Sequence, residues 1–186
     1  MGVKHVGDLR VTKDNLEYAA TLTEISGSVD ISAEGAQFPV LTSVGGSVDI
    51  SAEGAQFPVL TSVGGYVDIS AEGAQFPVLT SVGGYEIVPP DEQRANLEIV
   101  AKLALASDDA LDMSTWHSCT TTHCIAGWAA HAIPRGQEIE DGDEDKTVIA
   151  GHVLLGTEAA SYFFSTNEKA KAFLSRYLPA AETAPA

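Results

Sequence analysis

Residues 27–45 read Gly-Ser-Val-Asp-Ile-Ser-Ala-Glu-Gly-Ala-Gln-Phe-Pro-Val-Leu-Thr-Ser-Val-Gly, and the block recurs at 46–64 and, with Tyr66 in place of its serine, at 65–83. The period is nineteen residues. Self-similarity at a fixed period near twenty is typical of a solenoid. The sequence therefore predicts stacked coils of one shape, each of which buries its apolar side against its neighbours.

Each coil begins with a strand pattern. Val29 and Ile31 alternate with polar residues, which predicts that these two point inward and that Asp30 points outward. The apolar residues from Phe38 to Val44 are spaced by three, and they predict an irregular or short helical return path. We expect the Gly45-Gly46 pair to provide the bend, because glycine reaches positive φ at no steric cost.

The flanks of the repeat differ from it. An atypical first coil is predicted at 7–26, where Leu9 and Val11 align with Val29 and Ile31. Pro89-Pro90 ends the array, and a helix at 91–106 is predicted to close its apolar end. Further helices are predicted at 123–133, 147–155, 157–164 and 167–178, with an exposed acidic loop at 134–146.

Together these patterns predict an α+β protein. Residues 1–90 form a short right-handed parallel β-solenoid of about four coils, and 91–178 form a small helical domain that caps it. Ser165 and Glu168 have the spacing of a capping box at the start of the last helix. Residues 179–186, rich in alanine and proline, are predicted to be a disordered tail.

Two stretches resemble known groups of proteins. The pattern Phe-Pro-x-Leu-Thr-x-Val-Gly-Gly-x-Val-x-Ile resembles the short leucine-rich-like repeats of bacterial proteins, which are related to receptor L-domains. This resemblance covers about residues 7–88 and implies a binding surface without catalytic residues. Residues 116–128, Trp-His-x-Cys-x-Thr-x-His-Cys-x-Ala-Gly-Trp, resemble uncharacterised helical modules of bacterial and phage proteins, which implies a phage or mobile-element origin.

The composition restricts the partners. The formal net charge is −16, with 26 acidic and 10 basic residues, which makes direct contact with nucleic acid or anionic membranes unfavourable. No stretch has the length and apolarity of a membrane-spanning helix. The two cysteines, Cys119 and Cys124, are too few for a secreted disulfide scaffold, so we expect a cytoplasmic protein.

The repeat predicts two columns of carboxylates on the outside of the coils. Stacked coils place equivalent residues about 4.8 Å apart, so like charges repel. One interpretation is a negative stripe that binds a basic protein, and another is cation binding between stacked carboxylates. The third is that a duplicated unit simply duplicates its solvent-facing residues. The columns are Asp30, Asp49 and Asp68, and Glu34, Glu53 and Glu72.

A second candidate site is the cluster of His117, Cys119, His123 and Cys124. These are the residue types of a zinc site, but zinc modules usually take ligands from two separated knuckles, whereas all four residues lie within eight positions. A thiol nucleophile at a helix N-terminus and a disulfide are alternatives. The remaining interpretation is structural: Cys124 packs inward, and a threonine at 120–122 caps the helix.

The pattern as a whole favours a non-enzymatic protein-binding module without a cofactor. Its partner would be a basic protein surface or a nucleic-acid-binding protein, and a phage-type inhibitor, such as an anti-CRISPR or other counter-defence protein that mimics DNA, is one such module. The first alternative is a small metal- or thiol-dependent enzyme that uses the Cys/His cluster. The second is a self-associating structural protein, because near-identical repeats allow slipped pairing between copies and hence homo-oligomers.

Overall fold

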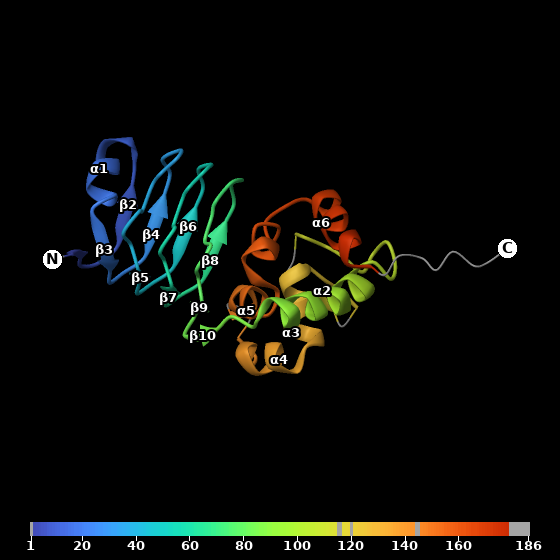
Figure 1. The fold of residues 1–186 in the computed structure, drawn as a ribbon. Coiled ribbons are helices and arrows are strands. Elements are labelled where there is room, and N and C mark those ends of the chain that lie inside the picture. Colours follow the sequence, from blue (N-terminus) through green and yellow to red (C-terminus); the bar gives the residue numbers. More distant parts are fainter. Residues whose placement is uncertain (1, 115–116, 120, 144–145, 179–186) are drawn as a thin grey trace.

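The computed structural model describes residues 2–114, 117–119, 121–143 and 146–178. Figure 1 shows a β-solenoid of stacked coils followed by a group of helices at its C-terminal end. The solenoid has about four coils with nineteen-residue spacing, as the repeat predicts. The predicted disordered tail, 179–186, lies outside the described residues.

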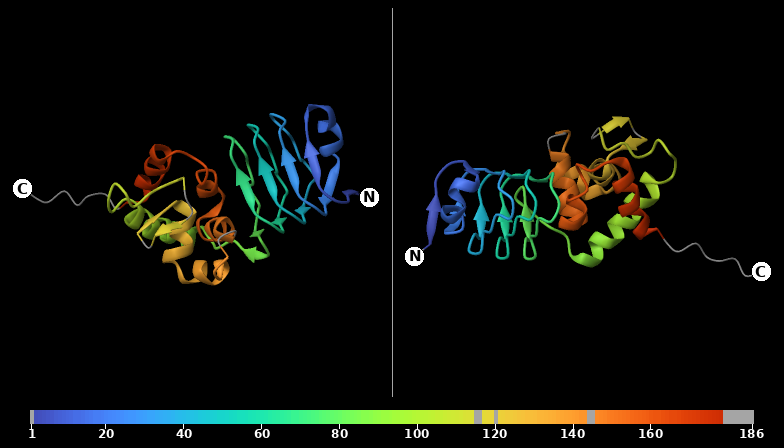
Figure 2. Two further views of the ribbon diagram at one scale, coloured as in Figure 1. Left: turned by 180° about the vertical axis from the view of Figure 1, so that it is seen from behind. Right: turned by 90° about the horizontal axis from the view of Figure 1, so that it is seen from above.

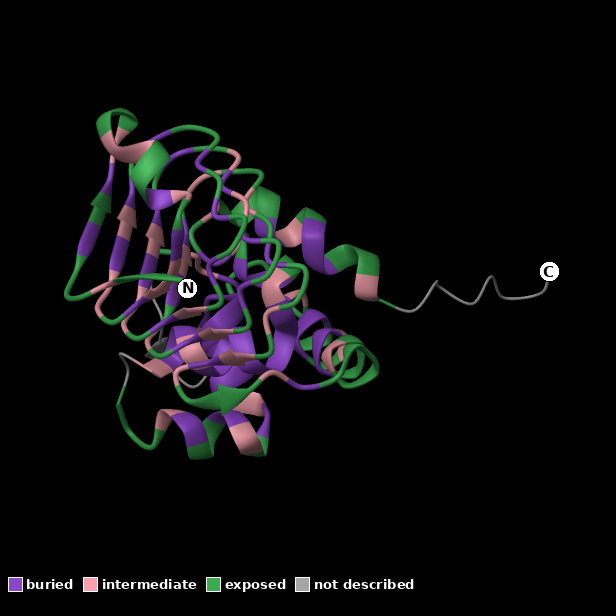
Figure 3. Cartoon of the chain, turned by 60° about the vertical axis from the view of Figure 1, so that its left-hand side comes forward, coloured by how far each residue is buried: buried purple, intermediate pink, exposed green. Residues whose placement is uncertain are grey.

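The predicted strands form one parallel sheet in register. Its order is β2 (Leu9–Val11), β4 (Val29–Ile31), β6 (Val48–Ile50) and β8 (Val67–Ile69). Leu9 pairs with Val29 and Val11 with Ile31, which confirms the alignment of the first coil with the repeat. The inward residues of these strands are buried and alternate with less buried ones (Figure 3).

A second sheet runs along the return path, where the sequence predicted irregular or helical structure. Its order is β1 (Val3–His5), β3 (Leu22–Ile25), β5 (Ser43–Val44), β7 (Ser62–Val63), β9 (Ser81–Val82) and β10 (Tyr85–Glu86). The prediction was wrong because a two-residue strand is too short to show a period of two. In the first coil, the helices η1 (Lys13–Asn15) and α1 (Leu16–Ala19) lie between β2 and β3.

The paired glycines between β5 and β6 are needed for close stacking. The predicted reason, a positive φ at Gly45-Gly46, is wrong: within the three blocks, positive φ occurs at Gly35, Gly54 and Gly73 and, at the end of the array only, at Gly83. A Cβ atom added at Gly64 would overlap the carbonyl oxygen of Gly45 in the coil below. Glycine is therefore required at this position because two backbones approach each other closely.

Replacing Gly64 by alanine is expected to lower the free energy of unfolding by about 1–3 kcal/mol, because the added methyl group overpacks the contact between two coils. Urea denaturation followed by circular dichroism measures the loss. The control is Ser62→Ala, since Ser62 lies in neighbouring β7 with a partly exposed side chain. Equal small losses in both variants would contradict this account of the glycine.

The array ends where β10 turns back antiparallel to β9 at Gly83 and Gly84, both with positive φ. The chain then forms α2 (Pro90–Ala104), β11 (His117–Cys119), β12 (Thr122–His123), α3 (Ile125–Ala132), α4 (Pro134–Glu140), α5 (Thr147–Ala160), α6 (Asn167–Leu174) and the 3₁₀ helix η3 (Ser175–Tyr177). The break at Gly156 within α5 confirms the predicted division between helices at 147–155 and 157–164. Three details differ from the prediction: residues 134–140 are helical, α5 ends at 160, and Thr166 rather than Ser165 caps α6.

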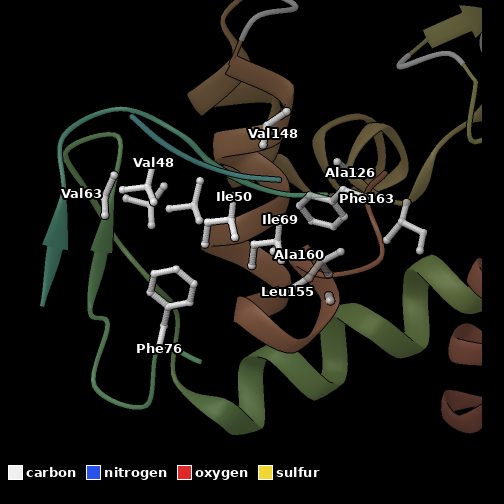
Figure 4. Close-up of a cluster of buried hydrophobic side chains, with 14 of the residues drawn as sticks. Val48, Ile50, Val63, Ile69, Phe76, Ala126, Val148, Leu155, Ala160 and Phe163 are labelled. Carbon is white, nitrogen blue, oxygen red and sulfur yellow. The ribbon is translucent and has the colours of Figure 1, made fainter. Parts of the chain in front are cut away.

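The helix that covers the last coil is α5, whereas the sequence predicted that the helix at 91–106 would do so. Helix α5 packs against β8 and β9, and the Val88 amide donates to the Val153 carbonyl oxygen at 3.0 Å. Figure 4 shows Ile69 of β8 beside Leu155, Ala160 and Phe163. α5 is the most uniformly apolar of the long helices, so it suits a position between the solenoid and α2, α3 and α4.

One buried apolar cluster extends from Leu9 in the first coil to Leu174 in α6. The two views of Figure 2 show the solenoid and the helices lying end to end. The division of the chain at 90/91 stays a prediction. Among the described residues, no helix has the length and apolarity needed to cross a membrane.

Candidate functional site

The aspartate column is formed as the repeat predicts. Asp30 pairs with Asp49 and Asp49 with Asp68 in the parallel register of β4, β6 and β8. Arg10 of β2 is in register with Asp30, and its Nε lies 3.4 Å from Asp30 Oδ2. The column therefore begins with a cation and continues as three carboxylates.

Asp49 and Asp68, the two aspartates farther from Arg10, are the ones whose pKa values are raised. Partial burial raises the pKa of Asp49, and the neighbouring charges of Asp68 and Asp30 raise it further, while the Tyr66 hydroxyl opposes the shift. Partial burial also raises the pKa of Asp68, against a hydrogen bond of 2.7 Å from Ser70 Oγ. Because a raised pKa means that the charged form is disfavoured, a nearby positive charge would stabilise both groups.

The glutamate column lies in the turns that follow the strands. The Gly35 amide donates to the Glu53 carbonyl oxygen at 2.8 Å, and the Gly54 amide donates to that of Glu72 at 3.0 Å, so successive turns stack. Glu34, Glu53 and Glu72 are all exposed. Glu72 is paired with Lys169 of α6, with Nζ 2.8 Å from Oε1.

Each column thus has a cation at one end, Arg10 at the first coil and Lys169 beyond the last. Asp49, Asp68, Glu34 and Glu53 have no ion pair among the described residues. These four residues, called the open carboxylates below, form the candidate binding surface. No group of three or more potential ligands in the described ranges is arranged to hold a metal ion, the stacked carboxylates included.

The sequence contained a signal for one of the two cations. Aligning Leu9 and Val11 with Val29 and Ile31 places Arg10 at the aspartate position, so the ion pair follows from the register. Lys169 was missed because it lies 97 residues from Glu72, and no local pattern connects them.

The Cys/His cluster is only partly brought together. His117 of β11 is paired with His123 of β12 through the backbone, while the side chains of His117 and Cys119 lie outside the described part of the chain. Cys124 is buried and is the N-cap of α3. The prediction that a threonine caps this helix was therefore wrong. Its Sγ accepts a hydrogen bond of 3.2 Å from the Gly127 amide.

The surroundings of Cys124 and His123 are those of a packed core. Burial raises the pKa of the Cys124 thiol to about 11, so the thiol is protonated and a poor nucleophile at neutral pH. The centre of the His123 ring lies 4.6 Å from the centre of the Trp128 ring and 4.7 Å from that of the His131 ring. Trp128 Nε1 donates to the Ala110 carbonyl oxygen at 2.8 Å, which ties this group to the loop after α2.

No family model, curated protein or solved structure matches the chain. The architecture is therefore known from the coils themselves: their period, their register and their shared burial. The chemistry at the surface has to be inferred from the open carboxylates and their surroundings.

Proposed function

We propose that this chain is a non-enzymatic binding protein whose open carboxylates contact a basic protein surface. The observation that carries the proposal is the in-register aspartate column, in which Asp49 and Asp68 have raised pKa values and no ion pair with any described residue. A fold that holds like charges at the inter-strand spacing of about 4.8 Å tolerates repulsion that a basic partner removes. Exposed Glu34 and Glu53 extend the negative surface from the strands into the turns.

The negative charge of the open carboxylates indicates the class of partner. A basic protein surface, and in particular one that handles nucleic acid, complements a regular negative array, and electrostatic steering accelerates such encounters. The specific form of the proposal is an intracellular, phage-type inhibitor that occupies the nucleic-acid site of its target, as an anti-CRISPR or other counter-defence protein would. The likeness of the coils to leucine-rich-like binding repeats, and of residues 116–128 to phage helical modules, supports this form.

The test compares two variants of equal net charge. Asp49→Asn/Asp68→Asn removes two open carboxylates, and Asp109→Asn/Glu138→Gln removes two exposed carboxylates of the helical part. The probe is a fluorescent ten-residue lysine peptide, whose binding is followed by anisotropy at low and at physiological salt. We expect the first variant to bind at least about fivefold more weakly than the wild type and the second to bind within about twofold.

Equal losses in both variants would overturn the proposed site, since net charge alone would then explain binding. Circular dichroism of each variant establishes that the fold is retained. If the peptide result holds, the same variants identify the natural target by quantitative capture from the host. That target is the basic protein retained by the wild type and by the second variant but lost by the first.

A further inference from the structure

A groove of about 480 Å³ lies between the last coil and the helices. Residues 69–73, at the end of β8 and in the turn after it, form one wall. The other wall comes from the turn after α5, from α6 and from η3, and includes Tyr162, Phe164, Lys169 and Arg176. In Figure 1 this is the region where β8 faces α6 across the end of the solenoid.

The repeats provide an internal comparison for this wall. Ala33 and Ala52 are buried, with exposed fractions of 0% and 9%, but the equivalent Ala71 is partly exposed. The same change occurs at two further positions. Ala36 and Ala55 are buried, but the equivalent Ala74 is partly exposed. Leu41 and Leu60 are buried, but the equivalent Leu79 is partly exposed. Helix α5 covers Val67 and Ile69, so the part of the last coil after β8 is left without the cover that a next coil would give.

The backbone of this segment also lacks the hydrogen bonds of earlier coils. Gly35 and Gly54 each donate to the following coil, at 2.8 and 3.0 Å, and the carbonyl oxygens of Ile31 and Ile50 each accept from it, both at 3.0 Å. Within the described residues, the Gly73 amide and the Ile69 carbonyl oxygen make no such bond. Both residues line the groove, so it presents a donor and an acceptor placed for an extended strand.

The groove is lined by more cations than carboxylates. Its charged lining residues are Lys169, Arg176 and Glu72, in a chain of net charge −16. Both cations already have an ion pair, Arg176 with Glu158 (Nη1 to Oε1, 3.1 Å) and Lys169 with Glu72. The Arg176 guanidinium lies 5.2 Å from the centre of the Phe173 ring and 5.9 Å from that of Tyr162. Lys169 is exposed and paired with exposed Glu72, so it remains accessible to a second carboxylate.

From these observations we infer that the groove binds an extended acidic peptide, which pairs with residues 69–73 as the next strand of the solenoid. Main-chain bonds to Ile69 and Gly73 supply affinity, as in other cases of strand addition, and small side chains fit over Ala71 as they do between earlier coils. An acidic side chain meets Lys169. This site is separate from the open carboxylates, so it stands or falls independently of the proposed function.

The probe is the fluorescently labelled peptide Ser-Ala-Glu-Gly-Ala-Gln with a blocked N-terminus. It copies residues 70–75, the segment that each coil stacks on the part of this edge that α5 leaves open. Its binding to the full chain is followed by fluorescence anisotropy. We expect saturable binding, at least about tenfold weaker with a scrambled peptide or with the Lys169→Glu variant. Lys171→Glu is the matched control, because Lys171 lies on the same helix but outside the groove lining, and it is expected to change binding less than about twofold.

Ala71→Leu is a second test variant that fills the groove from the opposite wall without changing charge, and it is expected to abolish binding. Equal binding of the scrambled peptide, or equal effects of the two lysine variants, would overturn the inference. If the peptide binds a chain shortened to end at Leu178 but does not bind the full chain, the groove is assigned to the chain's own C-terminal segment instead. A concentration-dependent dimer that the peptide dissociates, seen by sedimentation, would assign it to a second copy.

Discussion

Replacing Phe57 by alanine is expected to lower the free energy of unfolding by about 3–5 kcal/mol, the range for truncating a fully buried aromatic side chain. Phe57 is the middle ring of a stack, with ring centres 4.6 Å from those of both Phe38 and Phe76 and planes tilted by 3° and 7°. The variant therefore removes two aromatic contacts and leaves a cavity between two coils. Urea denaturation measured by circular dichroism and by tyrosine and tryptophan fluorescence gives the loss.

Phe76→Ala is the matched control for this prediction. Phe76 occupies the same position in the last coil, stacks on one phenylalanine and is 6% exposed. Its truncation is expected to cost at least about 1 kcal/mol less than that of Phe57, because one aromatic contact is lost instead of two. If the two variants lose the same stability, the stack contributes nothing beyond the burial of each ring.

The second large effect is a loss of stability in acid that originates at His152. This side chain of α5 is fully buried, its Nε2 lies 3.1 Å from Thr157 Oγ1, and its Nδ1 has no hydrogen-bond partner within the described structure. Burial lowers the pKa of His152 from 6.5 to about 4. Between these two pH values the unfolded chain binds a proton that the folded chain does not, so stability falls as the pH falls.

Each pH unit between the two pKa values costs about 1.4 kcal/mol, so His152 removes about 3 kcal/mol between pH 6.5 and pH 4. The His152→Gln variant, which cannot be protonated, is expected to show a correspondingly flatter dependence of unfolding free energy on pH. Both proteins share every carboxylate, so the difference between their curves isolates the histidine. Parallel curves from pH 7 to pH 4 would show that His152 titrates normally in the folded chain.

The features that repeat were predictable from the sequence. The sequence predicted that Val29 and Ile31 point inward and that the aspartates form a column. The same pattern occurs in three copies, so each copy supports the prediction made from the others. Their stacking required only that equivalent residues lie above one another. Even the ion pair at Arg10 follows from this rule.

The features that were missed depend on contacts between distant segments. Whether α2 or α5 covers the last coil is decided by packing, since both contain enough apolar residues to do so. The role of Gly45 and Gly64 depends on the distance between backbones of successive coils, which no local pattern reports. The groove beside Ala71 results from incomplete coverage of one copy of a repeat, and in the sequence that copy differs from the others only at Tyr66.

The cations at the column ends have a consequence for how this chain could change in length. Arg10 belongs to the first coil and Lys169 to α6, so neither lies within the three repeated blocks. An additional block inserted among them would leave the contacts at both ends intact while adding one aspartate, one glutamate and no basic residue. Gain or loss of whole blocks would therefore change the reach of the acidic surface in steps of about 4.8 Å without redesign of either end.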